Sequence, residues 1–137
     1  MELDFYNADC IEFMKTIDTE SINLTLTDIP YDEVNMATEN GLRKINKGKA
    51  DEITFDLDIF LEEVYRITKG TLIIFCGQGQ FSKIIKHFWD MKDYQGENIL
   101  VRQLVWKKLN PSPINGQFNY LSAVENAVWV KKVGGVL

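Results

Sequence analysis

The chain has 137 residues, of which 45% are hydrophobic and 26% charged, and its formal net charge is −5. This length and composition predict one domain with a single core and exclude an intrinsically disordered chain. The acidic balance excludes a general nucleic-acid coat protein, which would be basic. No stretch approaches the roughly 20 apolar residues of a membrane helix, and the N-terminus has no signal-peptide pattern.

The chain has two cysteines, Cys10 and Cys76, and one histidine, His87. None of them has a second ligand at metal-binding spacing, so we expect no metal site. The two cysteines are expected to be reduced thiols, as in intracellular proteins, and we expect a cytoplasmic location. His87 lies within a predicted helix, where a packed or surface role is the simpler expectation.

The first part of the chain predicts a strand, a helix and a second strand. Residues 3–6 are mostly apolar and predict a short strand. Residues 10–17 carry apolar side chains at helical spacing, and Asp9 before them is a suitable N-cap. Residues 22–27 are rich in β-branched side chains and predict a strand that ends at the sequence Asp-Ile-Pro-Tyr, residues 28–31.

Residues 32–56 show no clear period and predict a long mobile loop, because structureless segments of this length are usually functional or disordered. After this loop the sequence predicts a helix over 56–68, a strand over 71–75, a helix over 80–91, and strands over 99–107 and 124–131. The pair Lys69-Gly70 is expected to stop the first of these helices, and residues 76–79 to form a turn.

This alternation of strands and helices predicts an α/β fold with a mostly parallel sheet and helices on both faces. No helix separates the last two strands, so we expect them to pair antiparallel at one edge. Ligands of open α/β sheets bind outside the carboxyl ends of the strands. Asp9, residues 28–31 and residues 76–79 all follow predicted strands, so we expect them to share one site.

The sequence Asp28-Ile29-Pro30-Tyr31 is the motif with the clearest chemistry. An acid at a strand end is often only a cap for the next element. Here the proline fixes the backbone just beyond the acid, and the tyrosine then places a flat ring at the mouth of the sheet.

With these residues the chain resembles the amino-group DNA methyltransferases, which methylate adenine N6 or cytosine N4. Their signature is Asp/Asn/Ser-Pro-Pro-Tyr/Phe/Trp after the fourth strand. Asn7-Ala8-Asp9-Cys10 is similar to the family's acidic motif, and residues 104–108, 110–111 and 125–132 are similar to its later strands. The resemblance covers essentially the whole chain. It best fits the permuted class, in which the catalytic half comes first, and it implies a Rossmann-like methyltransferase fold.

The resemblance implies a role for each residue of the motif. The Asp28 carboxylate and the Ile29 backbone carbonyl would accept the two hydrogens of the target amine, with adenine N6 favoured over cytosine N4. Pro30 would fix the turn, and Tyr31 would stack on the flipped base. The family usually has proline where this chain has Ile29, which puts the stiffness of the turn, and hence the rate, in doubt. Asp9, Cys10 and Asp28 would contact S-adenosylmethionine.

The family's main cofactor grip, a Phe-x-Gly-x-Gly loop, has no match after residue 132. The run Phe75-Cys76-Gly77-Gln78-Gly79 has this pattern, but its position fits the turn after the fifth strand better. We therefore expect an incomplete fold and weak or absent cofactor binding by this chain alone. A second chain or a homodimer would complete the cofactor site. A truncated inactive product, or an inactive fold that binds DNA or protein, remains open.

Two loops are candidates for DNA contact. The basic residues Arg43, Lys44, Lys47 and Lys49 fall within seven positions, and Asn110 and Ser112 belong to a proline-rich loop. A solvated loop explains the basic cluster equally well on charge alone. Similarity to compact phage-type methylases favours a mobile-element or restriction-modification origin. A different Rossmann-like domain is the remaining alternative.

Overall fold

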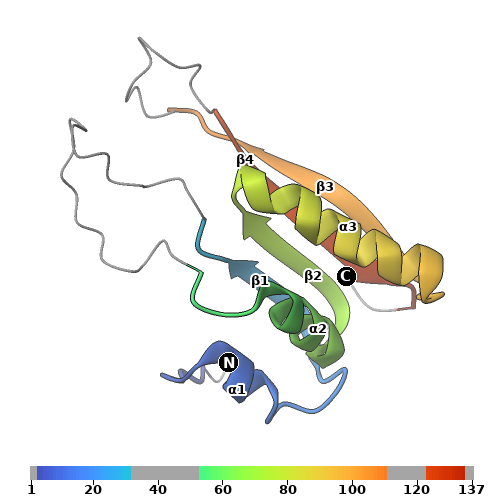
Figure 1. Ribbon diagram of the computed structural model, residues 1–137. Coiled ribbons are helices and arrows are strands. Elements are labelled where there is room, and N and C mark those ends of the chain that lie inside the picture. Colours follow the sequence, from blue (N-terminus) through green and yellow to red (C-terminus); the bar gives the residue numbers. More distant parts are fainter. Residues whose placement is uncertain (1–2, 32–52, 111–122, 135–137) are drawn as a thin grey trace.

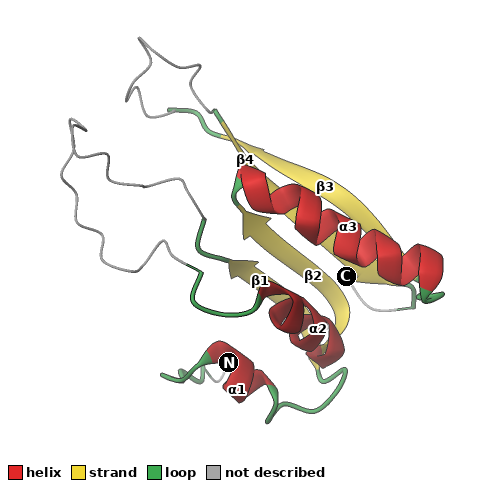
Figure 2. Cartoon of the chain, in the orientation of Figure 1, coloured by secondary structure: helices red, strands yellow, loops and turns green. Residues whose placement is uncertain are grey.

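The computed structural model describes residues 3–31, 53–110 and 123–134. Within these ranges the chain forms three helices and four strands, which follow one another in the order shown by Figures 1 and 2. The helices are α1 (Cys10–Met14), α2 (Leu57–Ile67) and α3 (Gln78–Tyr94), and the strands are β1 (Ile22–Asp28), β2 (Thr68–Cys76), β3 (Ile99–Lys107) and β4 (Val124–Lys132).

The four strands form one sheet in the order β1-β2-β4-β3. β1 and β2 are parallel, whereas β4 is antiparallel to both β2 and β3. Three strands therefore point the same way and β4 points the opposite way, which confirms the predicted fold class and the antiparallel pairing at one edge. The expectation of helices on both faces is wrong for the described residues, because α1, α2 and α3 all lie on one face of the sheet (Figure 1).

The core lies between this face of the sheet and helices α2 and α3. On α2 the apolar residues recur every three or four positions, so Leu61 and Val64 point to the same side and are almost completely buried. Ile84 and Phe88 of α3 and the sheet residue Ile74 have no exposed surface and belong to the same core cluster. Each such side chain contributes about 1.5–3 kcal/mol when it is removed from water.

Capping groups set where two of the helices begin. The Asp9 carboxylate accepts hydrogen bonds of 3.0 Å from the backbone N–H groups of Ile11 and Glu12, as predicted for an N-cap. Asp56 caps α2 in the same way. The glycine-rich turn is shorter than predicted, because Gly77 already serves as the N-cap and α3 begins at Gln78.

The predicted strand over residues 3–6 does not form. Leu3, Phe5 and Tyr6 are all exposed, and no strand within the described ranges pairs with them. The Tyr6 ring packs against Phe13 of α1 instead, with 4.4 Å between ring centroids. A strand needs a hydrogen-bonding neighbour, and the sequence pattern alone does not supply one.

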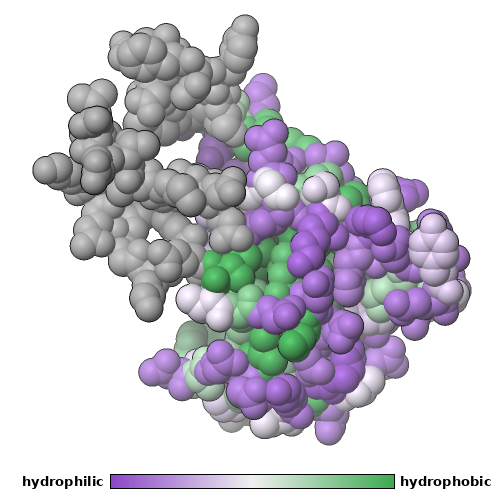
Figure 3. Space-filling view, viewed as in Figure 1, coloured by the Kyte–Doolittle hydropathy of each residue, from purple (hydrophilic) through white to green (hydrophobic). Residues whose placement is uncertain are grey.

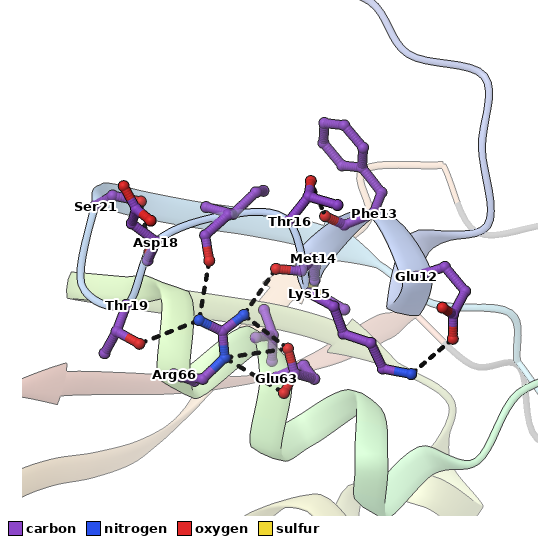
Figure 4. A network of polar contacts seen from close by, with 12 residues as sticks. Glu12, Phe13, Met14, Lys15, Thr16, Asp18, Thr19, Ser21, Glu63 and Arg66 are labelled. Atoms are coloured by element: carbon purple, nitrogen blue, oxygen red, sulfur yellow. Dashed lines mark hydrogen bonds and ion pairs between the residues drawn. The ribbon is translucent and has the colours of Figure 1, made fainter.

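The segment that joins α1 to β1 is fastened to α2 by Arg66 (Figure 4). The Arg66 guanidinium donates to the carbonyl oxygens of Met14 (2.7 Å) and Ile17 (2.9 Å) and to the Thr19 hydroxyl (3.1 Å). Glu63, one turn earlier, forms a 2.8 Å ion pair with the same guanidinium. One planar side chain thus satisfies the open end of α1 and fixes the approach to β1.

We expect Arg66→Lys to lower the free energy of unfolding by about 1–2 kcal/mol, because an ammonium keeps the charge but loses the forked geometry. Urea denaturation measures this change. Glu63→Gln is the control, since it leaves the carbonyl contacts of Arg66 intact and removes only a partly exposed ion pair worth about 1 kcal/mol or less. An equal or larger loss in Glu63→Gln would show that the ion pair, and not the carbonyl contacts, fastens the segment.

Candidate functional site

The candidate site is the turn Asp28–Tyr31, which begins at the carboxyl end of β1. Asp28 is the last residue of the strand, opposite Phe75 of β2, and its side chain is exposed. The next residue, Ile29, donates its backbone N–H to the Phe75 carbonyl (3.2 Å) and is only 4% exposed. The buried Ile29 side chain therefore anchors the turn from which the Asp28 carboxylate reaches solvent.

The carboxylate of Asp28 and the carbonyl of Ile29 are both available as acceptors. Asp28 forms no ion pair with any described residue. The Ile29 carbonyl oxygen accepts no hydrogen bond within the described ranges. The two acceptors thus belong to consecutive residues at the carboxyl end of β1.

The side chain of Gln80 holds the turn against the start of α3. Its Oε1 atom accepts from the Gly77 backbone N–H at 2.8 Å, and its Nε2 atom donates to the Pro30 carbonyl at 2.8 Å. Gln80 is 6% exposed, so both hydrogen bonds are shielded from water. We call this arrangement of Gly77, Gln80 and Pro30 the Gln80 clamp.

Gly77 leaves the space that Tyr31 occupies. A Cβ atom at position 77 would lie 3.3 Å from the Tyr31 Cβ and 3.1 Å from the Gln80 Oε1. A methyl group there would have to displace the turn or the clamp. At Gly79, by contrast, a Cβ atom would meet nothing within 4 Å. The first glycine of the Phe-x-Gly-x-Gly run is thus a packing requirement of the Asp28–Tyr31 turn.

Tyr31 is half-buried, and its hydroxyl is enclosed without a well-formed hydrogen bond to any described residue. Burial is the main reason why the pKa of Tyr31 lies far above its usual value, and the neighbouring Asp28 carboxylate raises it further. Burial, and then Asp28, also raise the pKa of the Cys76 thiol to about 11. Tyr31 and Cys76 therefore stay neutral near pH 7, beside a carboxylate.

Glu125 of β4 is a second acid near Tyr31, and its charge contributes to the raised pKa of the tyrosine. It pairs with Lys108 at 2.5 Å, and the Lys108 backbone N–H donates to the Ala123 carbonyl at 2.7 Å. These contacts join the ends of β3 and β4. Asn110 follows two residues later and is exposed.

The remaining predicted residues are not all brought to this turn. Asp9 and Cys10 are exposed at the start of α1, where Asp9 acts as the helix cap, and no hydrogen bond or ion pair among the described residues links them to Asp28. Arg43, Lys44, Lys47, Lys49 and Ser112 lie outside the described ranges. So do residues 32–52 of the predicted mobile loop, whereas residues 53–56 are described and belong to neither a helix nor a strand.

Sequence reasoning did not identify Gln80, Glu125 or Lys108 as parts of the site. A signal for Gln80 exists, since glutamine three residues after an N-cap is the spacing of a capping box. The contribution of Glu125 and Lys108 depends on the pairing of β3 with β4, which the motif alone does not specify.

An open cavity of about 620 Å³ lies between the starts of α2 and α3. Figure 3 shows apolar surface gathered in the middle of the helix-covered face, with hydrophilic side chains around it. Gln80 both lines the cavity and holds Pro30, so the cavity adjoins the Asp28–Tyr31 turn. The cavity is lined by Ile53, Phe55, Asp56, Leu57, Asp58, Gly79, Gln80 and Lys83.

In the part of the chain that the structure describes, no group of three or more His, Cys, Asp or Glu side chains is placed to hold a metal ion. None of the helices there has both the length and the apolar character needed to cross a bilayer.

Comparison with known proteins identifies the fold. The type II methyltransferase M.HinfI of Haemophilus influenzae is 32% identical over 94% of this chain. The solved structure of M1.HpyAVI in complex with SAM matches 96% of the chain with a TM-score of 0.59 and 20% identity. The cytosine-N4-specific DNA methyltransferase PvuII matches 93% with a TM-score of 0.57 and 16% identity. No family model matches the sequence.

The chain is thus similar to DNA methyltransferases over nearly its whole length. The amino-group methyltransferase resemblance inferred from Asp28–Tyr31 is thus confirmed, and so is the incomplete Rossmann-like fold. The chain spans 39% of the length of M.HinfI, 55% of M1.HpyAVI and 48% of PvuII. The matched part contains the strand end that carries Asp28.

We expect Gly77→Ala to displace Tyr31. The added methyl group would lie closer to Tyr31 and to Gln80 than ordinary van der Waals contact allows. The loss in the free energy of unfolding should be about 1–3 kcal/mol, measured by urea denaturation. Gly79→Ala is the matched control: Gly79 lies in the first turn of α3 with open space around it, and alanine favours a helix, so stability should stay equal or rise. Equal losses in both variants would contradict the packing role of Gly77.

We also expect the two thiols to react at very different rates with a disulfide reagent at pH 8. Cys10 is exposed, whereas Cys76 is buried and has a pKa of about 11, so little thiolate is present and little of it is accessible. In a Cys10→Ser variant Cys76 is the one remaining thiol, and it should react fast only after the protein has been unfolded. Fast reaction of Cys76 in the folded protein would show that β2 is not covered as described.

Proposed function

We propose that this chain is the catalytic half of an S-adenosylmethionine-dependent DNA methyltransferase that modifies an exocyclic base amine, adenine N6 in preference to cytosine N4. The observation that carries the proposal is the exposed Asp28 carboxylate at the carboxyl end of β1, which forms no ion pair with a described residue, next to the Ile29 carbonyl, which accepts no hydrogen bond from one. The similarity to M.HinfI supports the reaction class.

The two acceptors have a defined chemical role in this proposal. The lone pair of an exocyclic amine is delocalised into the base, which makes the nitrogen a poor nucleophile. Hydrogen bonds from the two amine hydrogens to Asp28 and to the Ile29 carbonyl favour a pyramidal nitrogen with an available lone pair. Methyl transfer then needs little beyond correct positioning, which is what the buried Ile29 and the Gln80 clamp supply.

Tyr31 is the proposed stacking partner of the target base. A base inside a duplex cannot reach the strand end, so it must be flipped out, and stacking on an aromatic ring holds it with about 1–3 kcal/mol. The cavity beside the clamp is the proposed space for the flipped base, and Phe55 offers a second ring on its wall.

S-adenosylmethionine, when bound, would supply the electrophilic methyl group. Asp9, Cys10 and Asp28 are the proposed contacts. The Asp9 side chain is exposed and caps α1 through Oδ1, while Oδ2 accepts no hydrogen bond from a described residue and could accept one from a hydroxyl or amine of the cofactor. A companion unit, on a second chain or a second copy, would complete the site, since the matched part of each relative is only about half of it or less.

DNA is the proposed substrate, with Arg43, Lys44, Lys47, Lys49, Asn110 and Ser112 as the proposed contacts. Contacts from these cations to phosphates would make DNA affinity fall steeply with salt concentration. We place the protein in the cytoplasm of a bacterial or phage-infected cell, within a restriction-modification system. The similarity to M.HinfI, a type II methyltransferase, supports this setting.

A chimera tests the catalytic role directly. This chain replaces the matching segment of M.HinfI, and methylated nucleosides in the DNA of the expressing cells are measured by mass spectrometry. We expect N6-methyladenine, and we expect Asp28→Ala to lower its formation by roughly a hundredfold or more. Asp93→Ala, an exposed acid on α3, is the control and should leave methylation unchanged.

The second candidate function is a non-enzymatic protein on the methyltransferase scaffold that binds DNA or another protein. It is favoured by the structural role of the Phe-x-Gly-x-Gly run at residues 75–79, whose first glycine caps α3 and packs against Tyr31. A chimera that folds but forms no methylated base would support this alternative, together with a cellular effect of the chain that survives Asp28→Ala.

A further inference from the structure

An ion pair joins the two sides of the cavity between α2 and α3. Lys83 of α3 and Asp58 of α2 both line the cavity, and the Lys83 Nζ atom lies 3.0 Å from the Asp58 Oδ2 atom. Both side chains are more than half exposed, at 54% and 57%. The pair therefore lies where the cavity opens to solvent and not in the core.

Charge is distributed unevenly around this cavity. The α2 side is acidic, because Asp58 lies in the first turn of α2 and the Asp56 carboxylate caps the helix just before it. The first turn of α3 has no acidic residue, and that side of the cavity is lined by Gly79, Gln80 and Lys83. These three residues recur at helical spacing and share one face of α3. An anion at the opening would therefore lie against α3 and away from α2.

Lys83 is one helical turn from the residue that holds the candidate site. Gln80 donates to the Pro30 carbonyl at 2.8 Å, and Lys83 follows it by three positions on the same face of α3. Both α2 and α3 begin on the side of the sheet where β1 and β2 end (Figure 1). The opening of the cavity and the Asp28–Tyr31 turn are therefore neighbours.

A base that enters the cavity leaves its sugar and phosphate at the opening, because a charged phosphate is costly to remove from water. Among the described residues that line the cavity, Lys83 is the one with a positive charge. Its ion pair with Asp58 is no obstacle, since exposed pairs are weak and are screened by water and salt. A phosphodiester would give the ammonium a new partner and would also release counterions condensed on the DNA.

We propose that Lys83 binds the backbone phosphate of the nucleotide whose base occupies the cavity, and that Asp58 holds the lysine at the opening until DNA replaces it. The proposal rests on the proposed function for the cavity as the space of the target base. Asp58 and the phosphate compete for one ammonium group. Removing the acid should therefore strengthen DNA binding, and removing the lysine should weaken it. An ion pair that only fastens α2 to α3 would be lost equally in both variants.

Fluorescence anisotropy of the full chain with a labelled single-stranded DNA oligonucleotide tests this competition. A single strand presents its bases without the cost of opening a duplex. We expect Lys83→Met to weaken binding about fivefold at about 0.1 M salt, because one phosphate contact on a single strand contributes a salt slope of about 0.7. The slope of log affinity against log salt should become shallower by about 0.7. Asp58→Asn should strengthen binding about two- to fivefold, as expected for the release of an exposed ion pair.

Lys86 and Asp90 of α3 provide matched controls. They form an ion pair with each other, and neither lines the cavity. Lys86→Met and Asp90→Asn change the net charge in the same way as the test variants, so their effect measures long-range electrostatics alone. Each should change the affinity by less than about twofold, because salt screens distant charges. Circular dichroism checks that all four variants keep the fold, which their exposed positions predict.

Three results would overturn the proposal. The first is that the unaltered chain binds no oligonucleotide at low salt. The second is an equal loss of affinity in Lys83→Met and Lys86→Met. The third is weaker binding in Asp58→Asn, because that result would show that the ion pair itself, and not the released lysine, supports the DNA contact.

The binding result and the catalytic result are separable, because the oligonucleotide assay involves no cofactor and no methyl transfer. The expected order of affinities, together with a folded chimera that forms no methylated base, would leave the phosphate site standing and refute the proposed function. Methylation by the chimera that depends on DNA concentration in the same way with and without Lys83→Met would refute the phosphate site alone.

Discussion

One buried amide group organises the candidate site. The Gln80 side chain accepts from Gly77 and donates to Pro30, so it ties the end of β1 to the start of α3. Both atoms of the amide are satisfied, and little of the residue is exposed. Without this bridge the carbonyl of Pro30 and the N–H of Gly77 would both need water at a packed strand end, and the turn would lose its fixed direction.

Other parts of the described structure also fix the position of the carboxyl end of β1, which carries Asp28. Arg66 fixes the approach to β1, β2 supplies the parallel partner that aligns Asp28 with Phe75, and Ile29 anchors the turn in the core. This anchor gives a physical reason why the motif tolerates isoleucine where the family usually has proline. A buried side chain restrains the backbone by packing, whereas proline restrains it through its ring.

The sequence predicts the local elements well and the long-range contacts poorly. The bounds of β3 agree with the prediction, and α2 differs by one residue at each end, because apolar periodicity and the Asp56 cap are both local signals. The predicted strand over residues 3–6 is wrong because no described strand pairs with it. Asp28–Tyr31 was recognisable from its motif, but Gln80 and Glu125 join the site only through folding that brings distant segments together.

The central claim is that folding places the Tyr31 hydroxyl in a buried position beside the Asp28 carboxylate. Nuclear magnetic resonance of ring-labelled tyrosine, with Tyr31→Phe to assign the signal, measures this directly. The account predicts that the pKa of Tyr31 lies well above that of free tyrosine and falls towards it in Asp28→Asn. An ordinary pKa for Tyr31 in the folded protein, unchanged by Asp28→Asn, would contradict the account.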